Sequence, residues 1–345
     1  LQISRKLIKR NHKVIVFTSN LLRDKKINIK HEIYEGIEIY RFRNWFKIGN
    51  FASFFPGIFF NTNKINPDII HIHSYRQPHN LIPLFTNKPC FITLHWPNYP
   101  KGLRNKLNDI IIPIFDKTVG KFLLSNFKKL IAVNENETEW IEKELKIKNK
   151  SVLIPNGIPK EYLKLRNPSI FRKKYKIKNN EFIVLSLSRI HKSKGLDLTV
   201  KVAKYFPNVK FIIAGKDEGH LNKLKKLKEN LKLKNLEFIG ELPENIKLNA
   251  FSAADIFLFP SHYEAFGIVV LEAFSQKAAV LSSDSGGLPW VISNSGLIFK
   301  DNNIEDLKNK LNLLIKNKNL REKYAKLGYN RAKNFTWDKI VDKLE

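Results

Sequence analysis

Short runs of apolar, mostly β-branched residues recur along the chain, and each is followed by an amphipathic segment. In the first half these runs occupy residues 14–17, 69–72, 91–94, 130–133 and 151–154. In the second half they occupy residues 182–187, 209–214, 236–239, 255–260 and 278–282. The runs are apolar throughout rather than alternating, so they predict strands of parallel sheets that helices cover on both faces.

The two series of runs are separated near residues 155–175, and the length of 345 residues suits two domains. We therefore predict an α/β protein with two doubly wound, Rossmann-like domains, the first over 1–157 and the second over 158–328. Ligands of such folds bind beyond the carboxyl ends of the strands. A cleft where two such edges face each other is the expected binding site.

The formal net charge is +29, which raises the question of a nucleic-acid-binding protein. Residues 1–150 carry a net charge of +14 and the remainder +15, so the surplus is spread evenly. A nucleic-acid-binding stripe would concentrate it, and we expect no nucleic-acid partner. The single cysteine, Cys90, excludes an internal disulfide and a multi-thiolate zinc site.

The opening segment is the most basic part of the chain. Residues 1–47 hold 12 basic and 4 acidic side chains. Aromatic residues follow at once: Trp45, Phe46, Phe51, Phe54, Phe55, Phe59 and Phe60. Basic residues beside exposed aromatics favour an anionic membrane surface, whereas the same phenylalanines could equally form ordinary core. The apolar stretch 110–124 is too short and too often interrupted to span a membrane.

Residues 260–274 carry the most informative chemistry. Glu264 and Glu272 lie eight positions apart, and Gly267 stands at the start of a predicted helix that follows a strand. Free backbone N–H groups at a helix N-terminus bind anions. Such an arrangement could hold a diphosphate between two carboxylates that accept hydrogen bonds from sugar hydroxyls.

This stretch resembles glycosyltransferase family 4, whose members have the GT-B fold of two Rossmann-like domains. The family carries two glutamates separated by seven residues within a Pro-Ser-x-x-Glu-x-Phe-Gly phrase, and Glu264 and Glu272 occupy both positions. The pattern continues into 285–289. The resemblance implies that Glu264 contacts the donor sugar and that Glu272 contacts the ribose. It also implies that the chain around the diphosphate includes Phe266, Gly267, Ile268 and Val269.

Other stretches carry the same resemblance. Residues 186–195 look like the family's Arg-and-Lys-Gly loop, with Ser188 in place of the usual glycine. Arg189 and Lys194 are therefore expected to bind the donor diphosphate and to offset the charge that develops on it as the sugar leaves. Residues 335–337 resemble the phrase that opens the last helix, so a helix over 329–345 should cross back to the first domain.

Three histidines of the first half lie at strand ends. His71 and His73 alternate on one strand, a spacing that could suggest a metal pair, but no third ligand is evident, and a structural or acceptor-side role is favoured. His95 ends the next strand. The family places a histidine there that faces the donor sugar, so His95 is the candidate for catalysis, with a structural histidine as the alternative.

Two absences shape the prediction. No Asp-x-Asp pair is present, and backbone N–H groups with Arg189 and Lys194 can take over a metal's charge, so we expect no metal and no bound cofactor. The chain also starts at Leu1 in what reads as a helix, whereas the family starts with a strand and a Gly-rich loop. We therefore expect this piece to be missing from an N-terminally truncated sequence.

The sequence thus predicts a retaining, metal-independent glycosyltransferase that uses a UDP- or GDP-sugar. The acceptor is expected to be a glycan or a lipid-linked molecule of cell-surface polysaccharide or glycolipid synthesis. A cytoplasmic location with peripheral contact at the inner membrane face suits the basic opening segment. A nucleotide-sugar epimerase on the same fold and a basic nucleic-acid-binding protein are the alternatives.

Overall fold

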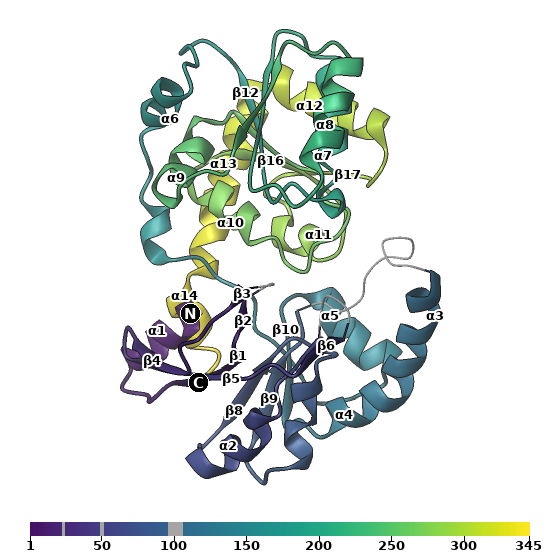
Figure 1. The fold of residues 1–345 in the computed structure, drawn as a ribbon. Helices are drawn as coiled ribbons and strands as arrows, with labels where there is room; N and C mark the ends of the chain where they lie inside the picture. The colour runs from purple at the N-terminus through teal and green to yellow at the C-terminus, as the bar shows by residue number, and fades with distance from the viewer. Residues whose placement is uncertain (23–24, 49–51, 96–105) are drawn as a thin grey trace. The chain divides into compact units, whose positions relative to one another are not determined.

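The computed structural model describes residues 1–22, 25–48, 52–95 and 106–345 (Figure 1). The chain divides into two compact units. Unit 1 comprises Leu1–Pro155 together with Ile340–Glu345, and unit 2 comprises Asn156–Lys339. Phe51, one of the aromatic residues singled out above, lies outside the described residues.

The described part of unit 1 contains a four-stranded parallel sheet and a smaller mixed sheet. The parallel sheet has the order β11-β10-β9-β8 and consists of β8 (Ile70–His73), β9 (Cys90–Thr93), β10 (Lys129–Ala132) and β11 (Ser151–Leu153). In the mixed sheet, β1 (Ile15–Ser19) pairs in parallel with β5 (Ile37–Phe42), which pairs antiparallel with β4 (His31–Tyr34). Two short antiparallel pairs complete the strands: β2 (Leu21–Leu22) with β3 (Lys25–Lys26), and β6 (Phe46–Ile48) with β7 (Ala52–Phe54).

The helices of unit 1 connect these strands. They are α1 (Gln2–Ile8), α2 (Gly57–Ile65), α3 (Lys106–Phe115), α4 (Lys121–Ser125) and α5 (Glu135–Glu139). Two π-helical turns continue them, η2 (Asp116–Gly120) between α3 and α4 and η3 (Trp140–Glu144) after α5, and a 3₁₀ segment η1 covers Pro78–Leu84.

Unit 2, which is described throughout, is built on a six-stranded parallel sheet of order β14-β13-β12-β15-β16-β17. Its strands are β12 (Ile183–Leu187), β13 (Lys210–Ala214), β14 (Leu236–Gly240), β15 (Ile256–Phe259), β16 (Ala279–Ser283) and β17 (Leu297–Phe299). Counted along the chain this order is 3-2-1-4-5-6, the order of the dinucleotide-binding Rossmann fold. The chain therefore switches direction across the sheet between β12 and β15.

Helices cover both faces of this sheet (Figure 1). They are α6 (Pro168–Lys174), α7 (Leu196–Ala203), α8 (Leu221–Asn230), α9 (Glu244–Ala253), α10 (Ile268–Ser275), α11 (Leu288–Ile292), α12 (Ile304–Lys316) and α13 (Lys318–Ala332). The last helix, α14 (Trp337–Val341), begins in unit 2 and ends in unit 1. Shorter 3₁₀ segments cover Lys160–Leu163, Lys192–Lys194 and Lys333–Phe335. Because both faces are covered, strands such as β12 and β15 are buried along nearly their whole length, which explains their uninterrupted apolar sequences.

The predicted α/β class and the parallel sheets are confirmed. The runs at 69–72 and 182–187, for example, correspond to β8 and β12 within one residue at each end. Among the described residues, the sequence analysis missed β17, β5 and the antiparallel strands β2, β3, β4, β6 and β7. These strands are short, largely exposed or, in β5, interrupted by polar residues, so they lack the continuous apolar run that marked the others.

The single helix predicted over 329–345 is wrong. The α13 helix ends at Ala332, and α14 begins only at Trp337. Between them Thr336 is extended and forms an isolated parallel bridge with Ile158. The N–H of Ile158 donates to Phe335 O at 2.7 Å and that of Trp337 to Ile158 O at 3.0 Å. This pairing takes the backbone groups that a continuous helix would have used.

Candidate functional site

The residues singled out in the second half gather at the carboxyl edge of the unit 2 sheet. β12 and β15 are neighbours there, and the segments 188–195 and 260–267 leave from their carboxyl ends. The chain order reverses between these two strands, and ligands of doubly wound sheets bind at such a switch point. The switch point of the fold therefore coincides with the motifs, which makes this edge the candidate site.

Lys194 and Glu264 form an ion pair across this switch point. The distance from Lys194 Nζ to Glu264 Oε2 is 2.5 Å, and both side chains are largely shielded from solvent. Ser261 Oγ lies 3.5 Å from the same carboxylate oxygen. A cation and a carboxylate are thus held side by side at this edge of the sheet.

Two glycines allow the loops of this edge to approach each other closely. Gly286 follows β16 with φ +58°, and a Cβ there would lie 2.1 Å from the backbone oxygen of Glu264. Gly195 has φ +59°, and its Cβ would lie 1.9 Å from the oxygen of Pro260. Any larger side chain would push these loops apart. Glycine at both positions therefore lets the loops that carry Lys194 and Glu264 stay close together.

The helix α10 starts directly behind Glu264. Gly267 is its N-cap, and the first internal bond runs from the N–H of Val270 to Gly267 O at 2.9 Å. The N–H groups of Gly267, Ile268 and Val269 come before that bond and are not used by the helix. Phe266 is buried against Trp290 and Phe335, so only its backbone could face a ligand.

Glu272 lies on α10 and is paired with Lys247 of α9. The distance from Lys247 Nζ to Glu272 Oε1 is 2.7 Å, and 17% and 12% of the two side chains are exposed. Burial raises the pKa of Glu272, although Lys247 opposes this shift. Burial would lower the pKa of Lys247, but Glu272 and Glu244 outweigh it and raise that pKa above its ordinary value.

Arg189 lies at the same edge, but its side chain pairs with Glu218 and not with Glu264. Its Nη1 lies 2.7 Å from Glu218 Oε2, and 60% of the arginine side chain is exposed. Arg189 is therefore held by a carboxylate that a diphosphate could replace. Ser188, which stands where glycine was expected, has an ordinary negative φ, and its N–H donates to Ala214 O at 3.1 Å. The larger residue is thus accommodated without backbone strain.

In unit 1 the three predicted histidines meet at the carboxyl edge of β8 and β9. His73 Nδ1 lies 3.2 Å from His95 Nε2, and the rings of His71 and His73 are 4.4 Å apart. His71 Nε2 lies 2.8 Å from Thr93 Oγ1. Burial lowers the pKa of His73 to about 3 and of His71 to about 4, and it lowers the pKa of His95 as well. All three imidazoles are therefore neutral at pH 7.

His95 adopts φ +60°, in the left-handed region that residues other than glycine seldom occupy. Such backbone conformations concentrate at functional sites.

Within the parts of the chain that the structure describes, no group of three histidine, cysteine, aspartate or glutamate side chains is placed to hold a metal ion.

Two family models together match nearly the whole chain. The sequence model described as "Glycosyl transferases group 1" matches residues 169–331, and that described as "Glycosyltransferase Family 4" matches residues 1–162. The processive diacylglycerol alpha-glucosyltransferase of Acholeplasma laidlawii is 32% identical over 265 residues, which cover 71% of this chain and 70% of that protein. The chain belongs to glycosyltransferase family 4.

Solved structures agree on the fold. Sucrose-phosphate synthase from Thermosynechococcus elongatus superposes with a TM-score of 0.81 at 19% identity, over 99% of this chain and 90% of that one. HepE of Anabaena in complex with UDP and glucose superposes with a TM-score of 0.73 at 18% identity, over 90% and 85%. This family 4 member therefore has the GT-B fold of two Rossmann-like domains.

Three charged partners of the family 4 site were missed by the sequence reading. Neither Lys247 nor Glu218 was singled out in the sequence, and only the fold brings them to Glu272 and Arg189. The third is His262, which lies inside the Pro-Ser-x-x-Glu phrase. Its Nδ1 is 2.7 Å from Asp301 Oδ1 and its Nε2 is 3.9 Å from Asp197 Oδ1.

His262 makes the stability of unit 2 depend on pH. The carboxylates of Asp197 and Asp301 raise its pKa to about 9, whereas in the unfolded chain it lies near 6.5. The charged His262 therefore stabilises the folded unit fully below pH 6.5. As the pH rises through 9 the imidazole loses its proton, and the free energy of unfolding falls by about 2–3 kcal/mol. We expect His262→Gln to remove this loss in urea unfolding followed from pH 6.5 to 9.

His220→Gln serves as the matched control, because His220 lies in unit 2 and has no raised pKa. That variant should keep the pH dependence of the unsubstituted protein. An equal pH dependence in His262→Gln would contradict the assignment.

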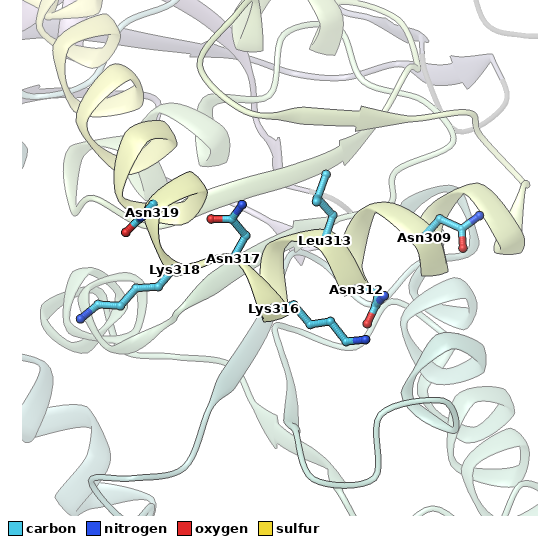
Figure 2. A pocket seen from close by; sticks show the side chains of 7 residues that line it. All are labelled: Asn309, Asn312, Leu313, Lys316, Asn317, Lys318 and Asn319. Atoms are coloured by element: carbon cyan, nitrogen blue, oxygen red, sulfur yellow. The ribbon is translucent and has the colours of Figure 1, made fainter.

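A surface hollow of about 760 Å³ lies elsewhere in unit 2, where α12 ends and α13 begins, within residues 309–319. Figure 2 shows its asparagine and lysine side chains spread along the two helices rather than converging on one point. It contains neither of the two motif glutamates and is formed by helices rather than by the sheet edge. We therefore do not assign the donor site to it.

Proposed function

We propose that this chain transfers a sugar from a nucleoside diphosphate-sugar to an acceptor with retention of configuration at the anomeric carbon. The observation that carries the proposal is the meeting of Lys194, Glu264 and the start of α10 at the switch point of the unit 2 sheet. The complex of Anabaena HepE with UDP and glucose supports a nucleotide-sugar donor. UDP and GDP are both retained as candidates.

In this proposal each group has a separate task. The backbone N–H groups of 267–269 bind the diphosphate, and Arg189 and Lys194 offset the negative charge that grows on it as the glycosidic bond breaks. Glu264 accepts hydrogen bonds from hydroxyls of the donor sugar. Glu272 accepts them from the ribose through the carboxylate oxygen that Lys247 leaves available.

We assign no carboxylate as a nucleophile. The acceptor hydroxyl attacks on the face from which the diphosphate departs, and its proton passes to the departing phosphate oxygen. His95 contributes as a neutral imidazole, since burial keeps its pKa low, and the contact with His73 fixes its ring. A neutral ring can donate a hydrogen bond to the sugar without placing a fixed charge beside it.

We further propose a lipid-linked or glycan acceptor of cell-surface polysaccharide or glycolipid synthesis, used at the cytoplasmic face of the inner membrane. The Acholeplasma relative, whose name states a diacylglycerol acceptor, supports a lipid. Within the described residues no helix is both long and apolar enough to cross a membrane.

The transfer reaction tests the proposal. Release of nucleoside diphosphate is followed with a panel of UDP- and GDP-sugars and a total lipid extract, and the product is analysed for the anomeric linkage. We expect turnover with one donor that requires the extract. Conversion of the donor to another sugar in the absence of any acceptor would instead show an epimerase.

Metal dependence gives a separate prediction. The charge of the leaving diphosphate is met by N–H groups, Arg189 and Lys194, so we expect EDTA to change the rate less than about twofold. A rate abolished by EDTA and restored by Mn²⁺ would contradict this division of labour.

A further inference from the structure

The stretch from Lys106 to Ser125 exposes more apolar side chains than is usual for a folded unit. α3, the π turn η2 and α4 follow one another directly, and no residue of α3 is buried. Six large apolar side chains of this stretch are 50–64% exposed: Leu107, Ile110, Ile111, Ile114, Val119 and Phe122. Soluble proteins seldom expose so many apolar side chains together, and such patches mark interaction sites. We call these six residues the apolar stripe.

The π turn keeps the apolar stripe on one side of the helix. The first four members are spaced by three and four residues, as on one face of an α-helix. Val119 follows Ile114 by five residues, a spacing that would leave the face of a regular α-helix. The intervening segment 116–120 is π-helical, with i→i+5 geometry, so it restores Val119 and then Phe122 to the same face.

The opposite side of the stretch is fixed to unit 1. Asp116 is buried and accepts hydrogen bonds from Arg76, with 2.9 Å between Arg76 Nε and Asp116 Oδ1. Leu123 and Leu124 are buried as well. The stretch is therefore anchored on one side while the apolar stripe faces outward.

The charges beside the apolar stripe are predominantly positive. Lys106, Lys117 and Lys121 lie on the same stretch. They outnumber its carboxylates, because Asp116 is buried and paired with Arg76 and only Asp109 remains. An exposed apolar face bordered by lysines is complementary to an anionic lipid surface, where the apolar groups enter the interface and the cations meet the head groups. A second copy of this chain, itself at +29, would be repelled.

We propose that α3, η2 and α4 dock unit 1 onto an anionic lipid surface, with the apolar stripe inserted at the head-group boundary. This deepens the membrane part of the proposed function, and it revises the location expected from the sequence. From the sequence, the candidates were the aromatic residues of 45–60. In the structure they differ in exposure, because Trp45, Phe46 and Phe60 are exposed whereas Phe55 is buried. They also come from a hairpin and α2 rather than from one continuous face.

Vesicle co-sedimentation tests the docking surface without any donor or acceptor. Vesicles of phosphatidylcholine with a quarter phosphatidylglycerol are compared with vesicles of phosphatidylcholine alone. We expect binding to the anionic vesicles that weakens as salt rises, and a loss of at least tenfold in Ile110→Glu with Ile114→Glu. Lys117→Gln with Lys121→Gln should weaken binding by about fivefold per lysine.

The matched control is Ile33→Glu with Ile69→Glu, because both isoleucines are exposed in unit 1 and the change in charge is the same. It should bind vesicles as the unsubstituted protein does. Equal binding by the Ile110 and Ile114 variant, equal binding to uncharged vesicles, or no binding at all would overturn the proposal. So would a dimer, seen by sedimentation without lipid, that only the Ile110 and Ile114 variant dissociates.

These outcomes are separable from failure of the proposed function. Nucleotide binding is measured on the same variants, and it should be unchanged because the substitutions lie in unit 1. Sugar transfer by a protein that ignores vesicles would leave the transferase assignment standing and remove only the docking surface.

Discussion

Replacing Glu264 by glutamine should lower kcat by about 10²–10³-fold, the loss typical of removing one preorganised polar group from a reacting centre. The change deprives Lys194 of its carboxylate partner at 2.5 Å and removes an acceptor for the sugar hydroxyls. The start of α10 and Glu272 are untouched. The Kd for the free nucleoside diphosphate should therefore change by less than about threefold. Initial rates of nucleoside diphosphate release and calorimetric binding measure the two effects separately.

Glu322→Gln is the matched control for this substitution, because Glu322 lies in unit 2 and its ion pair with Lys318 is highly exposed. It should leave kcat and the melting temperature unchanged. A Glu264→Gln enzyme with full kcat would remove Glu264 from the site, and a collapse of nucleotide binding would show that it serves the nucleotide instead.

The second large effect concerns Lys247. Lys247→Met leaves the carboxylate of Glu272 buried without its cation, and breaking a buried pair in this way costs about 3–5 kcal/mol in free energy of unfolding. Nucleotide binding should weaken with it, because the pKa of Glu272, already raised by burial, rises further. Urea unfolding and nucleotide titration check both parts. Lys318→Met, at an exposed pair of the same unit, should cost less than about 1 kcal/mol.

A double variant separates stability from binding. Lys247→Met combined with Glu272→Leu replaces the buried pair by apolar side chains, which should recover most of the lost stability. It should not recover nucleotide binding, since the ribose then meets no carboxylate. Recovery of both would mean that Glu272 has only a structural role.

The sequence was sufficient for the parallel sheets because strands covered on both faces must be apolar along their length, as β12 and β15 are. It was insufficient for the C-terminal helix, where pairing between Ile158 and Thr336, far apart in the chain, overrides local helix preference. Exposed strands such as β4 lack a burial pattern and were missed for that reason.

The candidate site shows the same division. Glu264, Gly267 and Glu272 could be found because they share one short phrase, and Lys194 because it follows a strand in a Lys-Gly pair. Lys247 and Glu218 could not, since each reaches its partner only through the packing of unit 2. The contact between His73 and His95 likewise depends on the pairing of β8 with β9, which places their ends side by side.

The most direct test of a nucleotide site at the switch point of unit 2 is thermal stabilisation by UDP, GDP, ADP and their sugar conjugates. A ligand that binds only the folded state raises the melting temperature according to its concentration over Kd. We predict that one nucleotide series raises the melting temperature of the unsubstituted protein and has no effect on Glu272→Ala. Stabilisation of equal size in Glu272→Ala, or none by any nucleotide, would contradict the assignment of the donor site to this edge.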